Sequence, residues 1–231
     1  MSTSHNSLGQ KIGYPLPTWN TCPKPAKKTM VGTYCCLEAL DTTRHGEDLW
    51  QAYTADTEDR IWTYLPYGPF TTQAQFEQWL TGQSATEDPL FYAIIDTSIG
   101  KAVGVATYLR IQPEVGVIEV GHINYSPALQ QTTAATEAMY LMMKNAFELG
   151  YRRYEWKCDN LNLGSQKAAK RLGFSHDGLF KQATIYKGRN RDTAWFSILD
   201  ADWPAINAEY QRWLAADNFT VDGIQLSKLS T

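Results

Sequence analysis

Three apolar runs separated by short turns constrain the fold of this chain more than any other feature of its sequence. The runs cover residues 90–95, 102–111 and 117–124. Turn segments at 96–101 and 112–116 join them, and strands connected so closely pair as antiparallel neighbours. The pattern therefore predicts an antiparallel meander.

The elements on either side of the meander indicate an α+β fold. Upstream, residues 29–40 carry strand signals, while 41–55 and 72–81 have the apolar spacing of helices. Downstream, a helix, a strand, a helix and a β-hairpin follow, and then a final helix; their predicted bounds are 134–150, 154–158, 165–172, 179–186 with 193–199, and 204–215.

Composition and charge argue against several classes of protein. The 231 residues suggest one large domain or one domain with a tail, and a net charge of −3 argues against a nucleic-acid partner. No apolar run is long enough to cross a membrane, and the first residues lack an apolar secretory signal. The four cysteines form no CxxC pair, so we expect neither a disulfide framework nor a metal site, and a cytoplasmic protein.

Small polar residues and two alanines begin the helix predicted at 134–150. The first N–H groups of a helix have no intrahelical partner, and with the helix dipole they favour an anion. Short side chains leave this backbone approachable, and hydroxyl and amide groups add donors; the candidate residues are Gln130, Gln131, Thr132, Thr133, Ala134 and Ala135. The alternative is an ordinary capped helix, with Thr132 or Thr133 as the cap.

Two motifs resemble those of the GNAT acyl-CoA N-acyltransferases, and within them the RimJ/RimL-like N-acetyltransferases. The first is QQTTAA, residues 130–135, which is similar to the family's Gln/Arg–x–x–Gly–x–Gly/Ala loop for the pyrophosphate of coenzyme A, although Thr133 replaces the usual glycine. The second is Asn162–x–x–Ser165 followed by Leu-Gly-Phe at 172–174. The resemblance covers roughly residues 30–199.

The resemblance implies a central mixed, mostly antiparallel twisted sheet with helices on both faces. It also implies acetyl-CoA or another acyl-CoA as co-substrate. We accordingly expect a flexible or surface-draped extension at 1–28, an acyltransferase domain at 29–200, and a C-terminal helix and tail at 201–231.

Glu119 is the candidate general base. It lies inside a predicted strand, where a carboxylate is costly unless it is paired or solvated from a cleft, and it matches the glutamate that the resemblance implies as base. Strand alternation would place Val117, Glu119 and Gly121 on one face and His122 on the other. A salt bridge or a solvent face is the alternative for Glu119, and His122 is a rival base.

The second motif supplies further candidates. The resemblance implies that Ser165 protonates the departing thiolate and that Asn162 bonds the pantetheine amide. The alternatives are that Ser165 caps the next helix and that Asn162 forms a turn leading into it. The bases Lys167, Lys170 and Arg171 could meet the 3′-phosphate of coenzyme A or form a solvated face.

The aromatic stretch RIWTYLPYGPF, residues 60–70, is the candidate wall for the acceptor amine. Trp62, Tyr64 and Tyr67 would provide this surface together with His122, and packing against the sheet or against a dimer partner is the alternative. A basic hairpin tip at 187–191 could bind an acidic substrate or be a solvated turn.

These features predict an N-acyltransferase that moves an acetyl or other short acyl group from acyl-CoA to a primary amine by direct attack. The acceptor would be a small molecule or a peptide, and a homodimer is possible. A non-catalytic module that senses acyl-CoA is the alternative, and a structural protein that has lost the cofactor is a third class.

Overall fold

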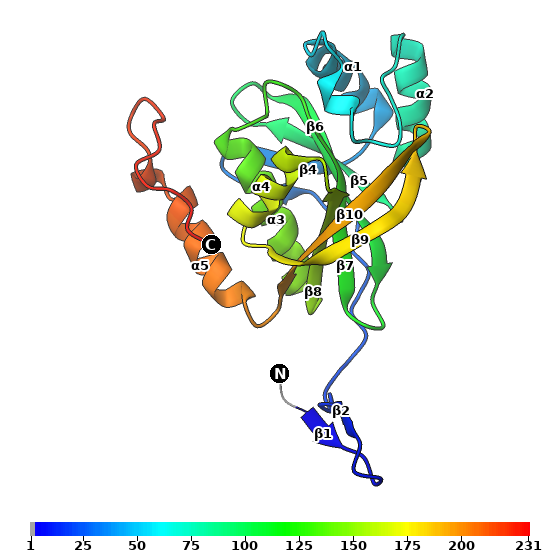
Figure 1. Cartoon of the computed structure of the whole chain (residues 1–231). Helices are drawn as coiled ribbons and strands as arrows, with labels where there is room; N and C mark the ends of the chain where they lie inside the picture. The colour runs from blue at the N-terminus through cyan, green and yellow to red at the C-terminus, as the bar shows by residue number, and fades with distance from the viewer. Residues whose placement is uncertain (1–2) are drawn as a thin grey trace.

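The computed structural model describes residues 3–231 and has a mixed eight-stranded sheet at its centre (Figure 1). The strand order is β3-β4-β5-β6-β7-β8-β10-β9, and every neighbouring pair is antiparallel except β7 and β8. The strands are β3 Met30–Val31, β4 Cys35–Ala39, β5 Leu90–Asp96, β6 Lys101–Gln112, β7 Val117–Tyr125, β8 Arg153–Asp159, β9 Ser175–Tyr186 and β10 Arg189–Leu199. The predicted meander is β5-β6-β7, and the α+β class is confirmed.

Helices cover both faces of the sheet, as predicted. The α-helices are α1 Thr42–Thr54, α2 Gln73–Ser84, α3 Thr133–Glu148, α4 Leu163–Arg171 and α5 Trp203–Leu214, and two 3₁₀ turns are η1 Arg60–Trp62 and η2 Ala216–Asn218. Alternate residues of β5 divide between two hydrophobic clusters. Phe91 and Ala93 pack in the cluster that contains α1 and α2 residues, whereas Tyr92 and Ile94 pack in the one that contains α3 residues.

The parallel pair β7 and β8 separates partway along its length. Pairing ends where Val120 lies opposite Trp156, although β7 continues to Tyr125 and β8 to Asp159. Backbone groups on the β8 side of β7 beyond Val120 therefore have no strand partner in this sheet. The divergence opens the middle of the sheet between α3 and α4.

The strand signals at 29–40 belong to two strands, because a tight turn divides this segment into β3 and β4. Glu137 of α3 is buried beneath this turn and accepts three backbone N–H groups, at 2.8 Å from Thr33, 2.6 Å from Tyr34 and 2.8 Å from Cys35. A Cβ at Gly32 would collide with the same carboxylate. The turn is thus built around a helix side chain that is distant in sequence.

Replacing Glu137 with glutamine should lower the free energy of unfolding by about 2–3 kcal/mol, because a neutral amide is a weaker acceptor for three buried donors and brings its own N–H groups among them. Chemical denaturation monitored by tryptophan fluorescence measures the loss. Glu148→Gln, at an exposed position of the same helix, is the matched control and should change stability by less than about 0.5 kcal/mol. Equal stability of the two variants would contradict this role.

The ends of the chain lie outside the sheet. A hairpin of β1 Thr3–His5 and β2 Lys11–Gly13 stands apart from the body in Figure 1. The following segment contacts the body, since the hydroxyls of Tyr92 and Tyr151 donate to the carbonyls of Ala26 and Pro23 at 2.7 and 3.2 Å. Residues 1 and 2 of the expected extension lie outside the described residues, and the three-part division of the chain stays a prediction.

Candidate active site

A cleft of about 1540 Å³ opens where β7 and β8 diverge. Many of the predicted site residues line it together: Tyr64, Glu119, His122, Gln130, Gln131, Ala135, Asn162 and Ser165. The other predicted residues, Trp62, Tyr67, Thr132, Thr133 and Ala134, are not among its lining residues. The cleft therefore joins the predicted anion turn to the predicted base.

A β-bulge in β7 brings His122 into the cleft beside Glu119. Thr107 of β6 lies opposite Gly121, but Val105 lies opposite Asn124, so β7 holds one extra residue. His122 takes a left-handed backbone conformation at φ 47°. The predicted alternation, with His122 and Glu119 on opposite faces, is wrong because the bulge resets it.

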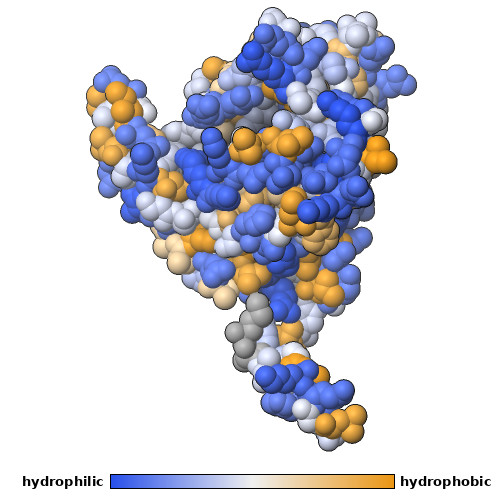
Figure 2. All heavy atoms as spheres, viewed as in Figure 1, coloured by the Kyte–Doolittle hydropathy of each residue, from blue (hydrophilic) through white to orange (hydrophobic). Residues whose placement is uncertain are grey.

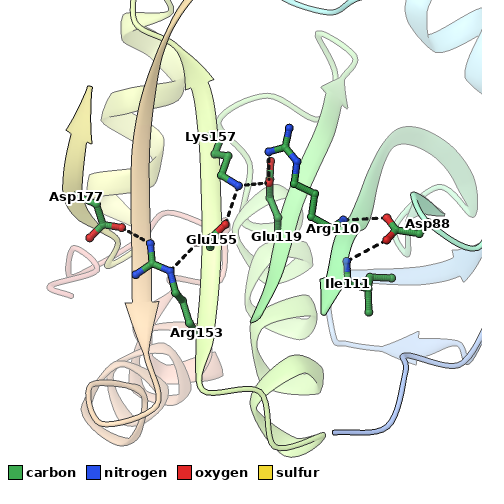
Figure 3. A network of polar contacts seen from close by, with 8 residues as sticks. All are labelled: Asp88, Arg110, Ile111, Glu119, Arg153, Glu155, Lys157 and Asp177. Carbon is green, nitrogen blue, oxygen red and sulfur yellow. Dashed lines mark hydrogen bonds and ion pairs between the residues drawn. The ribbon is translucent and has the colours of Figure 1, made fainter. Parts of the chain in front are cut away.

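A series of alternating charges crosses the sheet from β6 to β9 beside the cleft (Figure 3). Its members in order are Arg110, Glu119, Lys157, Glu155, Arg153 and Asp177. The strand register sets Glu119 opposite Glu155, and the buried ammonium of Lys157 separates them, 2.8 Å from Glu119 and 2.7 Å from Glu155. Two buried carboxylates would otherwise repel each other, so Lys157 makes their proximity tolerable.

Arg110 reaches Glu119 because hydrogen bonds from its backbone to the Asp88 carboxylate hold this part of β6 in place. Asp88 accepts the backbone N–H groups of Arg110 and Ile111 at 2.9 and 3.0 Å, within an irregular stretch of β6 where Arg110 has φ 47°. The Nη1 of Arg110 then lies 2.8 Å from Glu119 Oε2, as Figure 3 shows. More than half of the Arg110 side chain stays exposed, in contrast to that of Lys157.

The two oxygens of Glu119 have different surroundings. Oε2 accepts both cations, while Oε1 has no hydrogen-bond partner within residues 3–231 and is not among the fully enclosed unpartnered atoms. A Cβ at Gly121 would lie 3.7 Å from Oε1, so the glycine leaves the space beside this oxygen free of a side chain. Burial raises the pKa of the Glu119 carboxyl above its ordinary value, and Lys157 and Arg110 offset only part of that rise. Such a carboxylate is suited to accept a proton from a ligand in the cleft.

His122 is held as a neutral ring. Burial, together with the charges of Arg110 and Arg191, lowers its pKa to about 4. Its Nδ1 lies 3.1 Å from the hydroxyl of Tyr67, whose ring stacks on the imidazole. Of the two candidate bases, Glu119 is therefore better suited to accept a proton, because the His122 ring is only weakly basic.

The predicted aromatic wall divides between core and cleft. Trp62 is buried and packs edge-on against Tyr53 and Phe70, so the packing alternative holds for it. Tyr64 lines the cleft. The basic hairpin tip contacts this same loop, because Lys187 donates to the carbonyl of Trp62 at 2.8 Å, and residues 187–190 are exposed to solvent.

The start of α3 combines a cap with free amides. Thr132 is the N-cap, and its Oγ1 accepts the N–H of Ala135 at 3.1 Å. The N–H groups of Gln131, Thr133 and Ala134 have no hydrogen-bond partner within residues 3–231. The capped-helix interpretation is therefore confirmed, with Thr132 as the cap, and the anion site at the free amides stays a prediction.

The prediction that Ser165 caps the next helix is wrong, because α4 begins at Leu163 and Asn162 is its cap. The Asn162 Oδ1 accepts the N–H of Ser165 at 3.0 Å. Ser165 Oγ accepts the indole N–H of Trp156 at 2.9 Å, and this hydroxyl lines the cleft beside the Cys158 thiol.

Sequence reasoning missed Lys157 and Arg110 and assigned Arg171 no definite role. Arg171 lines the cleft and donates to Thr136 Oγ1 at 3.1 Å, whereas Lys167 and Lys170 are exposed and lie outside the cleft lining. The sequence of β8 does contain a signal for Lys157, because Arg153, Glu155 and Lys157 stand at alternate positions and so share one polar face of the strand. The sequence does not show that Glu119 of β7 is the ion-pair partner of Lys157.

Within residues 3–231, no cluster of three or more His, Cys, Asp or Glu side chains is placed to hold a metal ion. In the same range, no helix combines the length and apolar character that crossing a bilayer requires.

Comparison with known proteins identifies relatives of the whole cleft region. Residues 36–175 match the acetyltransferase (GNAT) domain family. A crystal structure of a GCN5-related N-acetyltransferase from Brucella melitensis is 46% identical, with a TM-score of 0.91, and the match covers 93% of this chain and 97% of that one. A probable acetyltransferase (GNAT family) from Chromobacterium violaceum is 41% identical, with a TM-score of 0.77 and coverage of 83% and 96%. The uncharacterized N-acetyltransferase YnaD of Bacillus subtilis is 26% identical over 67% of this chain and 89% of its own length.

Proposed function

The chain belongs to the GNAT acetyltransferase family, and on this premise we propose that it transfers an acetyl group from acetyl-CoA to a primary amine with Glu119 as general base. The observation that carries the proposal is the free Oε1 of Glu119 in a cleft that Gln131 also lines, next to the unpartnered amides of Thr133 and Ala134 at the start of α3. The acceptor is a small-molecule or peptide amine.

The residues present fit coenzyme A. The free N–H groups of Gln131, Thr133 and Ala134 suit a pyrophosphate, and the alanine side chain leaves that backbone approachable. Asn162 and Ser165 lie along the cleft between this turn and β8. When bound, acetyl-CoA supplies a thioester carbonyl for attack by the amine.

Each protein group has a role in the transfer. Glu119 Oε1 takes the proton of the amine, directly or through a water molecule, as the C–N bond forms. Backbone N–H groups of β7 beyond Val120, left without a strand partner, stabilise the carbonyl oxygen as it gains negative charge. The Ser165 hydroxyl gives its proton to the sulfur as the C–S bond breaks and takes a proton back from solvent in the cleft.

Release of free thiol from acetyl-CoA tests the proposal with a panel of amines and short peptides, supplemented by succinyl-CoA as a second donor. We expect amine-dependent thiol release with at least one acceptor class and acetylation of its nitrogen by mass spectrometry. A sensing module would bind acetyl-CoA in calorimetry without amine-dependent turnover, and absence of binding at millimolar acetyl-CoA would contradict both functions.

His122→Gln should reduce kcat by less than about tenfold, because a neutral imidazole of low pKa contributes orientation rather than proton transfer. The acid limb of the kcat/KM pH profile should stay where it is in the unmodified enzyme. Steady-state kinetics between pH 5 and pH 9 check this, and loss or displacement of the limb in this variant would show that His122 is the base.

A further inference from the structure

We propose that the C-terminal tail, residues 216–231, completes the cofactor site and, together with Trp213 of α5, holds the nucleotide end of coenzyme A. A second cavity, of about 480 Å³, lies between the start of α3 and this tail. Its tail side consists of Trp213, Phe219, Gly223 and Gln225. The inference rests on the proposed function, because it takes the cofactor pyrophosphate to lie at the start of α3.

The second cavity is continuous with the cleft at one place. Gln131, Thr136 and Arg171 line both, so the start of α3 forms their common border. A pyrophosphate on the free amides of that border, with its acyl arm directed along the cleft toward Glu119, leaves the nucleotide on the other side. The second cavity is the space on that side.

The walls of this cavity have the chemistry that a phosphorylated nucleoside needs. The partly exposed ring of Phe219 meets the buried ring of Trp213 edge-on at 5.6 Å, and an aromatic face such as that of Phe219 stacks on bases. The guanidinium of Arg171 lies 5.5 Å from the Trp213 ring and has no carboxylate partner within the described part of the chain, so it is free to pair with a phosphate. The Nε1 of Trp213 is also buried without an acceptor, which leaves an unused donor in this wall.

The tail is tied to the body by its own hydrogen bonds. Asn218 Nδ2 donates to the Trp213 carbonyl at 2.8 Å and its Oδ1 accepts the Ser227 N–H at 2.9 Å, while Thr231 Oγ1 donates to the Arg171 carbonyl at 2.8 Å. The tail follows α5 on the side of the molecule shown at the left of Figure 1. Figure 2 shows hydrophobic atoms on this tail. Val221 of the tail has a relative exposure of 103% and is not among the residues that line the cavity.

Binding of coenzyme A and of 4′-phosphopantetheine, which lacks the nucleotide, tests this inference by calorimetry. The full chain should bind coenzyme A at least about tenfold more tightly than 4′-phosphopantetheine. A chain ending at Ala215 should lose most of that difference, with its affinity for 4′-phosphopantetheine unchanged. If the shortened chain keeps the full preference for coenzyme A, the tail does not hold the nucleotide and the inference is overturned.

A point variant decides the matter where the shortened chain does not fold. Phe219→Ala should weaken coenzyme A by about fivefold or more without affecting 4′-phosphopantetheine, and Val221→Ala on the same loop should affect neither. Equal coenzyme A affinity in both variants would overturn the inference while leaving the proposed function intact. A full chain that binds neither ligand would instead overturn the proposed function, and the inference with it.

Discussion

Glu119→Gln should lower kcat for amine acetylation by about 10²–10⁴-fold, because an amide cannot take the proton that the attacking amine must lose. The affinity for coenzyme A should change by less than about threefold, since the free amides at the start of α3 are independent of this side chain. Steady-state thiol release and calorimetry on the same preparations separate the two quantities.

Glu114→Gln is the matched control, because Glu114 is an exposed residue in the turn before β7. It should leave kcat and affinity unchanged. Thermal denaturation of the Glu119→Gln enzyme shows whether the fold survives loss of the ion pairs. If the folded variant retains kcat within about threefold, Glu119 is not the base, and its role is only to form the salt bridges with Arg110 and Lys157.

Lys157→Met should lower the free energy of unfolding by about 3–5 kcal/mol at neutral pH, because it leaves Glu119 and Glu155 buried opposite each other without the cation that separates them. Methionine keeps an unbranched apolar side chain but removes the ammonium, which also lies 3.7 Å from the centre of the Trp195 ring, so the loss reports charge rather than volume. The deficit should shrink as the pH falls, since protonated carboxyls no longer need the ammonium. Denaturant titrations at several pH values measure it.

The same substitution should displace the acid limb of kcat/KM. Lys157 is one of the two cations that hold the pKa of Glu119 down against burial, so removing it should raise this pKa and move the limb to higher pH. Lys170→Met, at an exposed position of α4, should move neither stability nor the limb. A limb that stays in place with Lys157→Met would mean that the limb belongs to another group.

The fold could be predicted from the sequence because its signals are local. The apolar runs of β5, β6 and β7, joined by short turns, allow little except a meander, and the spacing of apolar residues in α3 sets its buried side. The GNAT resemblance is confirmed by the family match over 36–175. The anion turn and Glu119 were likewise found from short motifs, and their roles stay predictions.

The features that sequence reasoning missed depend on contacts between distant segments. In the sequence, Glu137 is only one polar position of an amphipathic helix. In the structure, its carboxylate accepts three backbone N–H groups of the turn between β3 and β4. The bulge that brings His122 beside Glu119 has one sequence signal, Gly121 inside the strand VIEVGHI, which simple alternation ignores. Asn162 rather than Ser165 caps α4 because either type of residue can cap, and only the backbone decides which does.

A crystal structure with a non-transferable thioether analogue of acetyl-CoA would show whether the start of α3 holds the co-substrate with its acetyl group beside Glu119. We expect a pyrophosphate bonded to the N–H groups of Gln131, Thr133 and Ala134. We also expect the acetyl carbonyl between β7 and β8, with Glu119 Oε1 about 3 Å from a water molecule or amine beside the carbonyl carbon. A pyrophosphate bound elsewhere, or an acetyl group out of reach of Oε1, would contradict this expectation.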